Sequence, residues 1–158
     1  MCFVDADDWI PGNAIDIMVK HAEETNADVV EGGMTRVLGR HKFAKYFHTK
    51  TYKEITTPEL FDDYFISFFG VNILSVNLCG KIFKKELFQN PELKPSGFKM
   101  GEDLILNMRI FPSISKYIVI EENVYFYRYG GGTSRYNPNM YSDLKSQYYI
   151  KLDAIKKY

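Results

Sequence analysis

Residues 2–9 read CFVDADDW, a short apolar run that ends abruptly in acidic side chains. Such a run is typical of a buried strand with its carboxyl end at the acids. Ligands of α/β sheets bind beyond the carboxyl ends of the strands. The stretch therefore predicts an α/β fold with a site at this end of the strand. Asp5 and Asp7, one residue apart, offer the oxygen ligands that Mg²⁺ and Mn²⁺ favour, and Asp8 is a possible substitute ligand. The alternative is an acidic turn that begins the next helix.

Helical and strand patterns alternate after this stretch. Helices are expected from Asn13 to about residue 26, from Thr57, over 102–111, and from Asn137 to the C-terminus. The last helix carries Tyr141, Leu144, Tyr148, Leu152 and Ile155 on one stripe. Strands are expected at 28–38, 42–52, 81–83, 117–120 and 124–129, and Gly32-Gly33 indicates a bulge in the first of them. With no linker or repeat, residues 1–158 form one domain.

Composition excludes several classes of protein. The 158 residues hold 20 Lys and Arg against 20 Asp and Glu. This balance argues against a nucleic-acid binder, which needs a basic surface. Two cysteines, Cys2 and Cys79, indicate reduced thiols rather than a disulfide scaffold, and the predicted location is the cytoplasm. The longest uncharged run, residues 64–80, is too short and too polar for a transmembrane segment, and the N-terminus lacks the basic region of a signal peptide.

Two further groups of residues carry possible chemistry. In GEDL, residues 101–104, Glu102 and Asp103 begin a helix, where the free backbone N–H groups stabilise anions. A carboxylate there can act as a general base, although acids are also common at plain helix starts. In YFYR, residues 125–128, Arg128 precedes a glycine loop and Ser134. Such an arginine can pair with phosphate, and the loop can close over a ligand. The alternative is an edge strand with a surface arginine.

The three motifs together resemble the family 2 glycosyltransferases of the GT-A fold. FVDADDWIP, GEDLILN and YFYR followed by the loop occur in the family's order and spacing, and residues 77–88, NLCGKIFKKELF, resemble the segment between the acidic motifs. The resemblance implies the C-terminal half of a Rossmann-like GT-A domain, with a mixed sheet flanked by helices. It also implies inverting, metal-dependent transfer from a nucleotide-sugar donor to a saccharide or other hydroxyl acceptor. The setting would be bacterial polysaccharide biosynthesis, in the cytoplasm or peripherally at the inner membrane face.

The resemblance also assigns roles to individual residues. Asp7 would hold the Mn²⁺ or Mg²⁺ that bridges the diphosphate, and Asp5 would contact the ribose or the metal. Asp103 would be the catalytic base, with Glu102 helping to hold the acceptor. Arg128 and the 130–134 loop, Ser134 included, would lie near the diphosphate.

One departure from the family concerns the position of the D-x-D motif. Family members carry a nucleotide-binding half before it, whereas here only four residues precede Asp5. We therefore expect a partial GT-A domain that lacks this half. The uncovered strand edge and apolar face at residues 1–4 then predict self-association, most simply as a homodimer.

Two other functions compete with glycosyl transfer. A non-catalytic module that binds acceptors or assembles with partners would explain a partial domain. A haloacid-dehalogenase-type phosphatase also has D-x-D after a strand, but it needs Thr or Val two residues after the second Asp and a downstream G-D-x-x-x-D. The sequence has Trp9 at that position and lacks the second motif.

Overall fold

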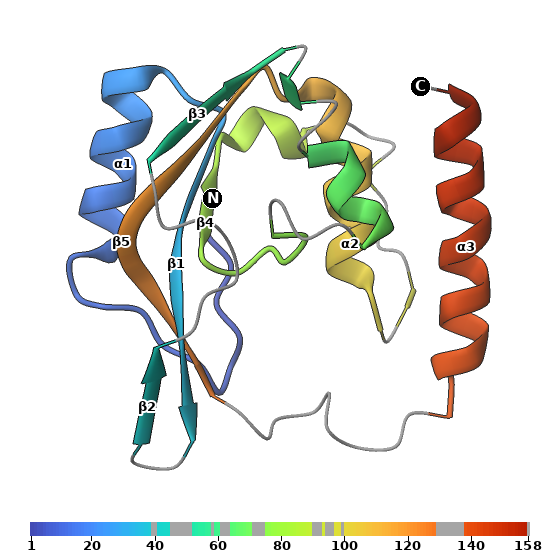
Figure 1. The fold of residues 1–158 in the computed structure, drawn as a ribbon, viewed down its shortest axis with the longest axis horizontal. Coiled ribbons are helices and arrows are strands. Elements are labelled where there is room, and N and C mark those ends of the chain that lie inside the picture. Colours follow the sequence, from blue (N-terminus) through green and yellow to red (C-terminus); the bar gives the residue numbers. More distant parts are fainter. Residues whose placement is uncertain are drawn as a thin grey trace.

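The computed structural model describes most of the chain in an α/β arrangement (Figure 1). The described residues are 1–38, 41–44, 52–57, 59–60, 64–70, 75–89, 93, 97–98, 100–128 and 138–157. The helices are α1 (Ala14–Thr25), α2 (Glu102–Ile110) and α3 (Met140–Lys157). Short 3₁₀ turns are η2 (Ile66–Phe69), η3 (Lys85–Phe88) and η4 (Phe111–Ser113). The strands are β1 (Val29–Leu38), β2 (His41–Ala44), β3 (Lys53–Thr56), β4 (Lys81–Phe83) and β5 (Lys116–Arg128).

The sheet is mixed, as predicted. Among the described residues its order is β2-β1-β5-β3, and β4 pairs with β1. The two long strands, β1 and β5, run parallel, while β2 and β4 pair antiparallel with β1 and β3 pairs antiparallel with β5. The confirmed fold class is therefore an α/β unit in which one parallel pair forms the centre.

A bulge interrupts the β1–β5 pairing where the sequence has Gly32-Gly33. Register shifts occur between Glu31 and Gly33 and again between Gly33 and Met34. A side chain at Gly32 would collide with Val124, whose Cγ2 would lie 2.5 Å from its Cβ, so only glycine fits here. The bulge predicted in β1 is thus confirmed. The two strands predicted at 117–120 and 124–129 are wrong in one respect, because they form the single strand β5.

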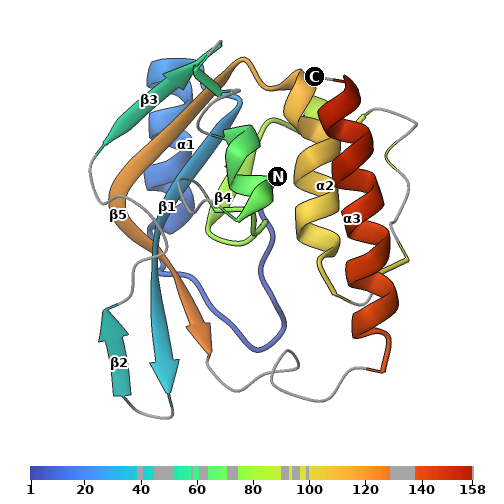
Figure 2. The same ribbon diagram turned by 45° about the vertical axis from the view of Figure 1, so that its right-hand side comes forward.

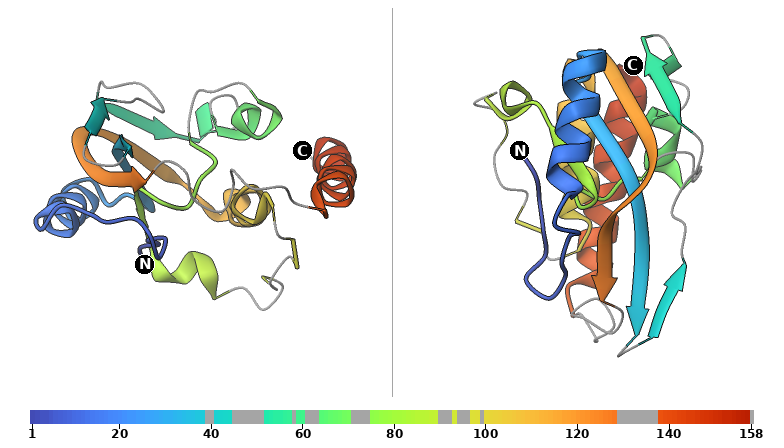
Figure 3. Two further views of the ribbon diagram at one scale, coloured as in Figure 1. Left: turned by 90° about the horizontal axis from the view of Figure 1, so that it is seen from below. Right: turned by 90° about the vertical axis from the view of Figure 1, so that its left-hand side faces the viewer.

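The sheet buries both of its faces. Val29 and Tyr117 belong to a core cluster on the α2 side, which also contains aromatic residues of the 64–68 segment. Their neighbours Val30 and Ile118 point the other way and pack with Met18 of α1. This alternation follows from the two-residue period of a strand. Figure 3 shows α1 on one side of the sheet, α2 on the other, and α3 on the outer side of α2.

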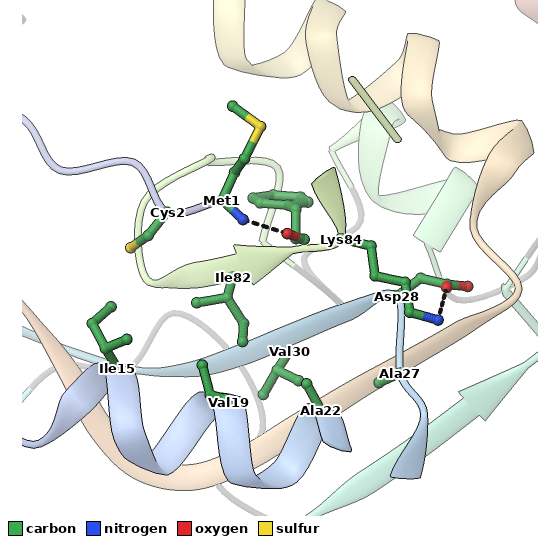
Figure 4. A pocket seen from close by; sticks show the side chains of 11 residues that line it. Met1, Cys2, Ile15, Val19, Ala22, Ala27, Asp28, Val30, Ile82 and Lys84 are labelled. Carbon is green, nitrogen blue, oxygen red and sulfur yellow. Dashed lines mark hydrogen bonds and ion pairs between the residues drawn. The ribbon is translucent and has the colours of Figure 1, made fainter. Parts of the chain in front are cut away.

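The N-terminal run does not form the buried strand predicted for it. Cys2 and Phe3 make isolated bridges to Ile82 and Cys79, but Met1 and Val4 are about half exposed, at 52% and 45%. Within the described chain, the backbone of this segment pairs with residues 79–83 only. Beside it lies an apolar pocket of about 330 Å³ between α1 and β4 (Figure 4), which Ile15 and Val19 help to line.

The stripe of large side chains on α3 is mostly exposed to solvent. Tyr141 is 79% exposed and Tyr148 58% exposed. The buried positions are polar instead: Asp143 and Gln147 are less than a tenth exposed, and Gln147 Nε2 donates to the Met100 carbonyl at 2.7 Å. The inner face of α3 therefore donates to a backbone carbonyl just before α2. Figure 2 shows the two helices side by side.

Helix 102–110 is more deeply buried than its sequence indicates. Asn107 and Ile110 lie off the face that carries Leu104, Ile105 and Met108, yet both are almost fully buried. They are enclosed because the helix has neighbours on both sides, with the core cluster on one and α3 on the other. None of the helices in the described part of the chain is long and apolar enough to cross a membrane.

Three predicted segments can be compared with the structure only in part. The strand predicted over 42–52 is described as β2 at 41–44. The helix predicted from Thr57 is described at residues 59–60 and 64–69. The loop at 130–134, with Ser134, lies outside the described residues.

Candidate active site

The Asp5–Asp8 turn is built on the end of β5. Asp8 N–H donates to the Asp5 carbonyl at 3.1 Å and closes the turn. The Tyr125 hydroxyl accepts the Asp5 N–H at 3.1 Å and donates to Asp8 Oδ2 at 2.8 Å. Because Tyr125 is fully buried, these two bonds fix the turn against the sheet. A tyrosine that sequence reasoning placed only on a strand is thus the main support of the D-x-D turn.

Arg128 lies on the same turn, as the resemblance implies. Its backbone N–H donates to Asp8 Oδ1 at 2.7 Å and its Nε donates to the Asp7 carbonyl at 2.8 Å. Its guanidinium carbon lies 5.3 Å from the centre of the Trp9 ring, which stacks on Phe126. Both oxygens of Asp8 are therefore engaged, and Asp8 is a poor substitute metal ligand. Within the described residues the Asp7 carboxylate has no hydrogen-bond or ion-pair partner, and it is exposed.

The second acidic pair begins α2. Gly101 has φ +80°, and a side chain there would meet Gln147 at 2.3 Å, so glycine is required for the chain to enter the helix beside α3. Glu102 is exposed, while Asp103 is partly buried and its Oδ2 accepts the Leu78 N–H at 3.1 Å. Asp103 therefore also holds the segment before β4, a structural role that sequence reasoning missed.

The two acidic groups form one electrostatic site. Burial raises the pKa of Asp5, and the charges of Asp8, Asp7 and Glu102 raise it further. Burial also raises the pKa of Asp103, and the charges of Glu102 and Asp5 act in the same direction, whereas the Leu78 N–H and the Lys81 charge lower it. The structure thus brings Asp5, Asp7, Glu102, Asp103 and Arg128 to one end of the sheet.

Cys79 lies between the two acidic groups and was not predicted as a site residue. Burial raises the pKa of its thiol to about 12, and the nearby charges of Asp5 and Asp103 act in the same direction. The thiol also interacts with the Tyr125 hydroxyl. It is therefore a neutral spacer rather than a nucleophile. Its position within the 77–88 motif was the available sequence signal.

The donor set of the site suits a hard cation that also binds substrate. No group of three or more His, Cys, Asp or Glu side chains is arranged to hold a metal in the described ranges. Asp5 and Asp7 can offer two carboxylates, so diphosphate oxygens and water would have to complete the shell. Mg²⁺ is commonly bound in this way, through one or two carboxylates and substrate phosphates.

Comparisons with known proteins point to glycosyltransferases. No known protein-family profile matches the chain. Glycosyltransferase GlyA of Streptococcus pneumoniae serotype 4 is 26% identical over 138 residues, which are 83% of this chain and 19% of that protein. The chain therefore spans about a fifth of the curated relative that it matches.

Solved structures of TarS residues 1–349 from S. aureus share the fold. In complex with UDP-GlcNAc, TarS superposes with a TM-score of 0.67 and 20% identity, covering 92% of this chain and 40% of TarS. The complex with UDP superposes with a TM-score of 0.64 and 18% identity, covering 95% of this chain and 39% of TarS. TarS without a named ligand superposes with a TM-score of 0.60 and 21% identity, covering 80% of this chain and 35% of TarS. The chain therefore has the fold of part of TarS and resembles a glycosyltransferase in sequence.

Proposed function

We propose that this chain carries the metal- and acceptor-binding part of a glycosyltransferase. The reaction transfers a sugar from a nucleoside-diphosphate sugar to a hydroxyl acceptor with inversion. The observation that carries the proposal is the meeting of the D-x-D turn and the Asp103 carboxylate, almost a hundred residues apart in sequence, on either side of Cys79. The similarity to GlyA and the fold shared with TarS support the same class of reaction.

Asp103 acts as the general base. Its Oδ2 is held by Leu78 N–H, and Oδ1 has no hydrogen-bond partner in the described part of the chain. Oδ1 takes the acceptor's hydroxyl proton as the acceptor oxygen bonds to the anomeric carbon. The bond from that carbon to the diphosphate breaks, and the diphosphate leaves with the electron pair. The raised pKa of Asp103 brings it closer to neutral pH, where a general base works best.

The turn and its neighbours bind the donor. Asp7, exposed and without a hydrogen-bond partner in the described chain, and Asp5 would hold Mn²⁺ or Mg²⁺. When bound, the cation neutralises charge on the diphosphate. Arg128 is oriented by the Asp7 carbonyl and by Trp9, and its remaining N–H groups bind diphosphate oxygens. Exposed Glu102 contributes an acceptor contact, and Ser134 of the 130–134 loop contributes to the diphosphate site.

The test is metal-dependent release of UDP by the whole protein that carries this chain. A panel of UDP-sugars that includes UDP-GlcNAc is supplied with Mn²⁺, and released UDP is measured with and without excess chelator. Asp7→Asn should abolish metal-dependent donor binding, while Asp16→Asn, an exposed acid of α1, is the matched control. Full activity in chelator would remove the metal from the proposal. Saccharide binding without any UDP release would favour the non-catalytic module.

A further inference from the structure

A fully buried lysine lies behind the candidate base. Lys81 of β4 has no exposed surface, and its Nζ donates to the Ser75 carbonyl. The Nζ also lies 3.7 Å from a Glu31 carboxylate oxygen and within 5.6 Å of the Tyr64 and Tyr117 ring centres. Tyr117 donates to the same Glu31 oxygen. The cation is thus enclosed by a carboxylate, a carbonyl and two aromatic faces.

Such a group is costly for a fold to keep. Taking a lysine and a glutamate out of water costs several kcal/mol per ion before their attraction is counted. Replacing a buried pair by apolar residues is often neutral or stabilising. In the three-residue strand β4, the other buried side chain is the apolar Phe83. The strand alone therefore gives no reason for a lysine here.

Lys81 and Asp103 both bind the segment of residues 75–78. Residues 75–78 are fixed at three points: Lys81 binds the Ser75 carbonyl, Asn107 Nδ2 donates to the Val76 carbonyl at 2.7 Å, and Leu78 N–H donates to Asp103. Asn107 also donates to the Asp103 carbonyl at 2.9 Å. The Lys81 anchor and the Asp103 carboxylate are thus at opposite ends of one four-residue clamp.

We infer that Lys81 is a positioning residue: by anchoring Ser75 it keeps the Leu78 N–H on Asp103 Oδ2, so that Oδ1 faces the acceptor. The catalytic meaning of this inference rests on the proposed function, but the linkage itself does not. The charged and titratable groups that face Asp103 are Glu102, Asp5, Cys79 and Lys81. Those that face Lys81 are Glu31, Asp103, Cys79, Tyr64 and Tyr117.

The test removes both buried charges together. Lys81→Met with Glu31→Gln leaves no uncompensated ion, and the new amide oxygen at position 31 can still accept from Tyr117. We expect amide exchange at Leu78, followed by NMR in the 158-residue chain, to become at least tenfold faster. The Ile105 N–H, which bonds to the Gly101 carbonyl at 3.2 Å, should keep its rate and so report that α2 still begins normally. The matched control is Lys20→Met with Glu24→Gln, an exposed pair on α1.

A second measurement leaves Lys81 intact. Asp103→Ala removes the acceptor at the other end of the clamp, and the Lys81 ammonium protons should then exchange faster than in the unchanged chain. Unchanged Leu78 exchange in a folded double variant, or unchanged Lys81 exchange in Asp103→Ala, would overturn the inference.

Activity separates this inference from the proposed function. In the whole protein, the double variant should lower kcat about tenfold with KM unchanged, because a base out of position affects the chemical step more than binding. Normal turnover in Asp103→Asn would remove Asp103 from the proposed mechanism, while the exchange rates would still decide whether Lys81 and Asp103 are linked.

Discussion

The two acidic regions of the site are supported in opposite ways. The Asp5–Asp8 turn is largely exposed and is tied to β5 through one buried hydroxyl and the Arg128 backbone. Asp103 is partly buried and stands at the edge of a polar network that includes Asn107 and Lys81. An exposed carboxylate remains available to a cation and a diphosphate. Partial burial raises the pKa of the Asp103 carboxyl, and its hydrogen bond fixes its orientation. Both properties suit a group that accepts a proton.

The largest effect, a loss of turnover, should come from replacing Asp103, the partly buried base. Asp103→Asn keeps an oxygen that can accept the Leu78 N–H but cannot take a proton. We expect turnover to fall about 100-fold or more, the usual range for a general base, while metal-dependent binding of UDP is retained. A turnover assay and a UDP titration on one preparation measure this. Near-normal turnover would shift the role to Glu102.

The buried network should prove more important for stability than any part of the exposed turn. Asn107→Ala leaves the Tyr64 hydroxyl and the Val76 carbonyl without their partner inside the core. We expect a loss of about 2–5 kcal/mol in the free energy of unfolding, measured by denaturant titration. Asn123→Ala, which removes an exposed bond to Thr35, is the control and should cost under about 1 kcal/mol. Equal losses would contradict a special importance of the buried network for stability.

The turn should respond to loss of its one buried support. Tyr125→Phe removes the acceptor of Asp5 N–H and the donor to Asp8, for a loss of about 1–2 kcal/mol. It should also weaken metal-dependent UDP binding, since the turn is no longer held. Tyr141→Phe, on the exposed face of α3, is the matched variant and should change neither. Unaltered UDP binding in folded Tyr125→Phe would mean that Arg128 and the backbone pairing of Trp9 with Phe126 suffice to hold the turn.

The smallest effect concerns the pH dependence of stability. The pKa of Asp103 is raised in the folded chain, so ionising this group opposes folding above its folded pKa. The opposition is absent below the unfolded pKa of about 3.9. Asp103→Asn should therefore be slightly more stable than the unchanged chain at pH 7, with the difference vanishing on acidification to pH 3. Thermal melts at both pH values measure it, and a variant that is less stable at pH 7 would assign Asp103 mainly to folding.

The sequence predicted those features that have a local cause. The mixed α/β class, the bulge at Gly32-Gly33, the short strand at 81–83 and the helix at 102–110 all follow from residue periodicity and glycine. The functional roles of Asp5, Asp7, Glu102, Asp103, Arg128 and Ser134 stay predictions. For the first five, the structure adds that they lie at one end of the sheet, and Ser134 falls outside its described part.

What sequence reasoning missed depends on contacts between distant elements. Periodicity identifies an apolar stripe on α3 but not which face has a neighbour, and here the polar face meets the Met100 carbonyl. Lys81 and Asn107 look like surface residues by type and become buried only because partners from other elements satisfy them. Met1–Val4 has the composition of a buried strand, yet in the described chain it makes only isolated bridges to Ile82 and Cys79.

The bulge between β1 and β5 changes the pairing register of the two strands. From Glu31 to Met34 the chain advances three residues along β1, while their partners advance six along β5, from Val119 to Tyr125. The surplus is odd, so it inverts which residues of β5 point to each face. Tyr117 therefore serves the buried network, whereas Tyr125, an even number of residues later, serves the opposite face and the acidic turn. Deleting one residue from the exposed 121–123 segment would restore the original parity and turn Tyr125 away from Asp8. The spacing between these two tyrosines is thus as strict a requirement of the site as the identity of its acids.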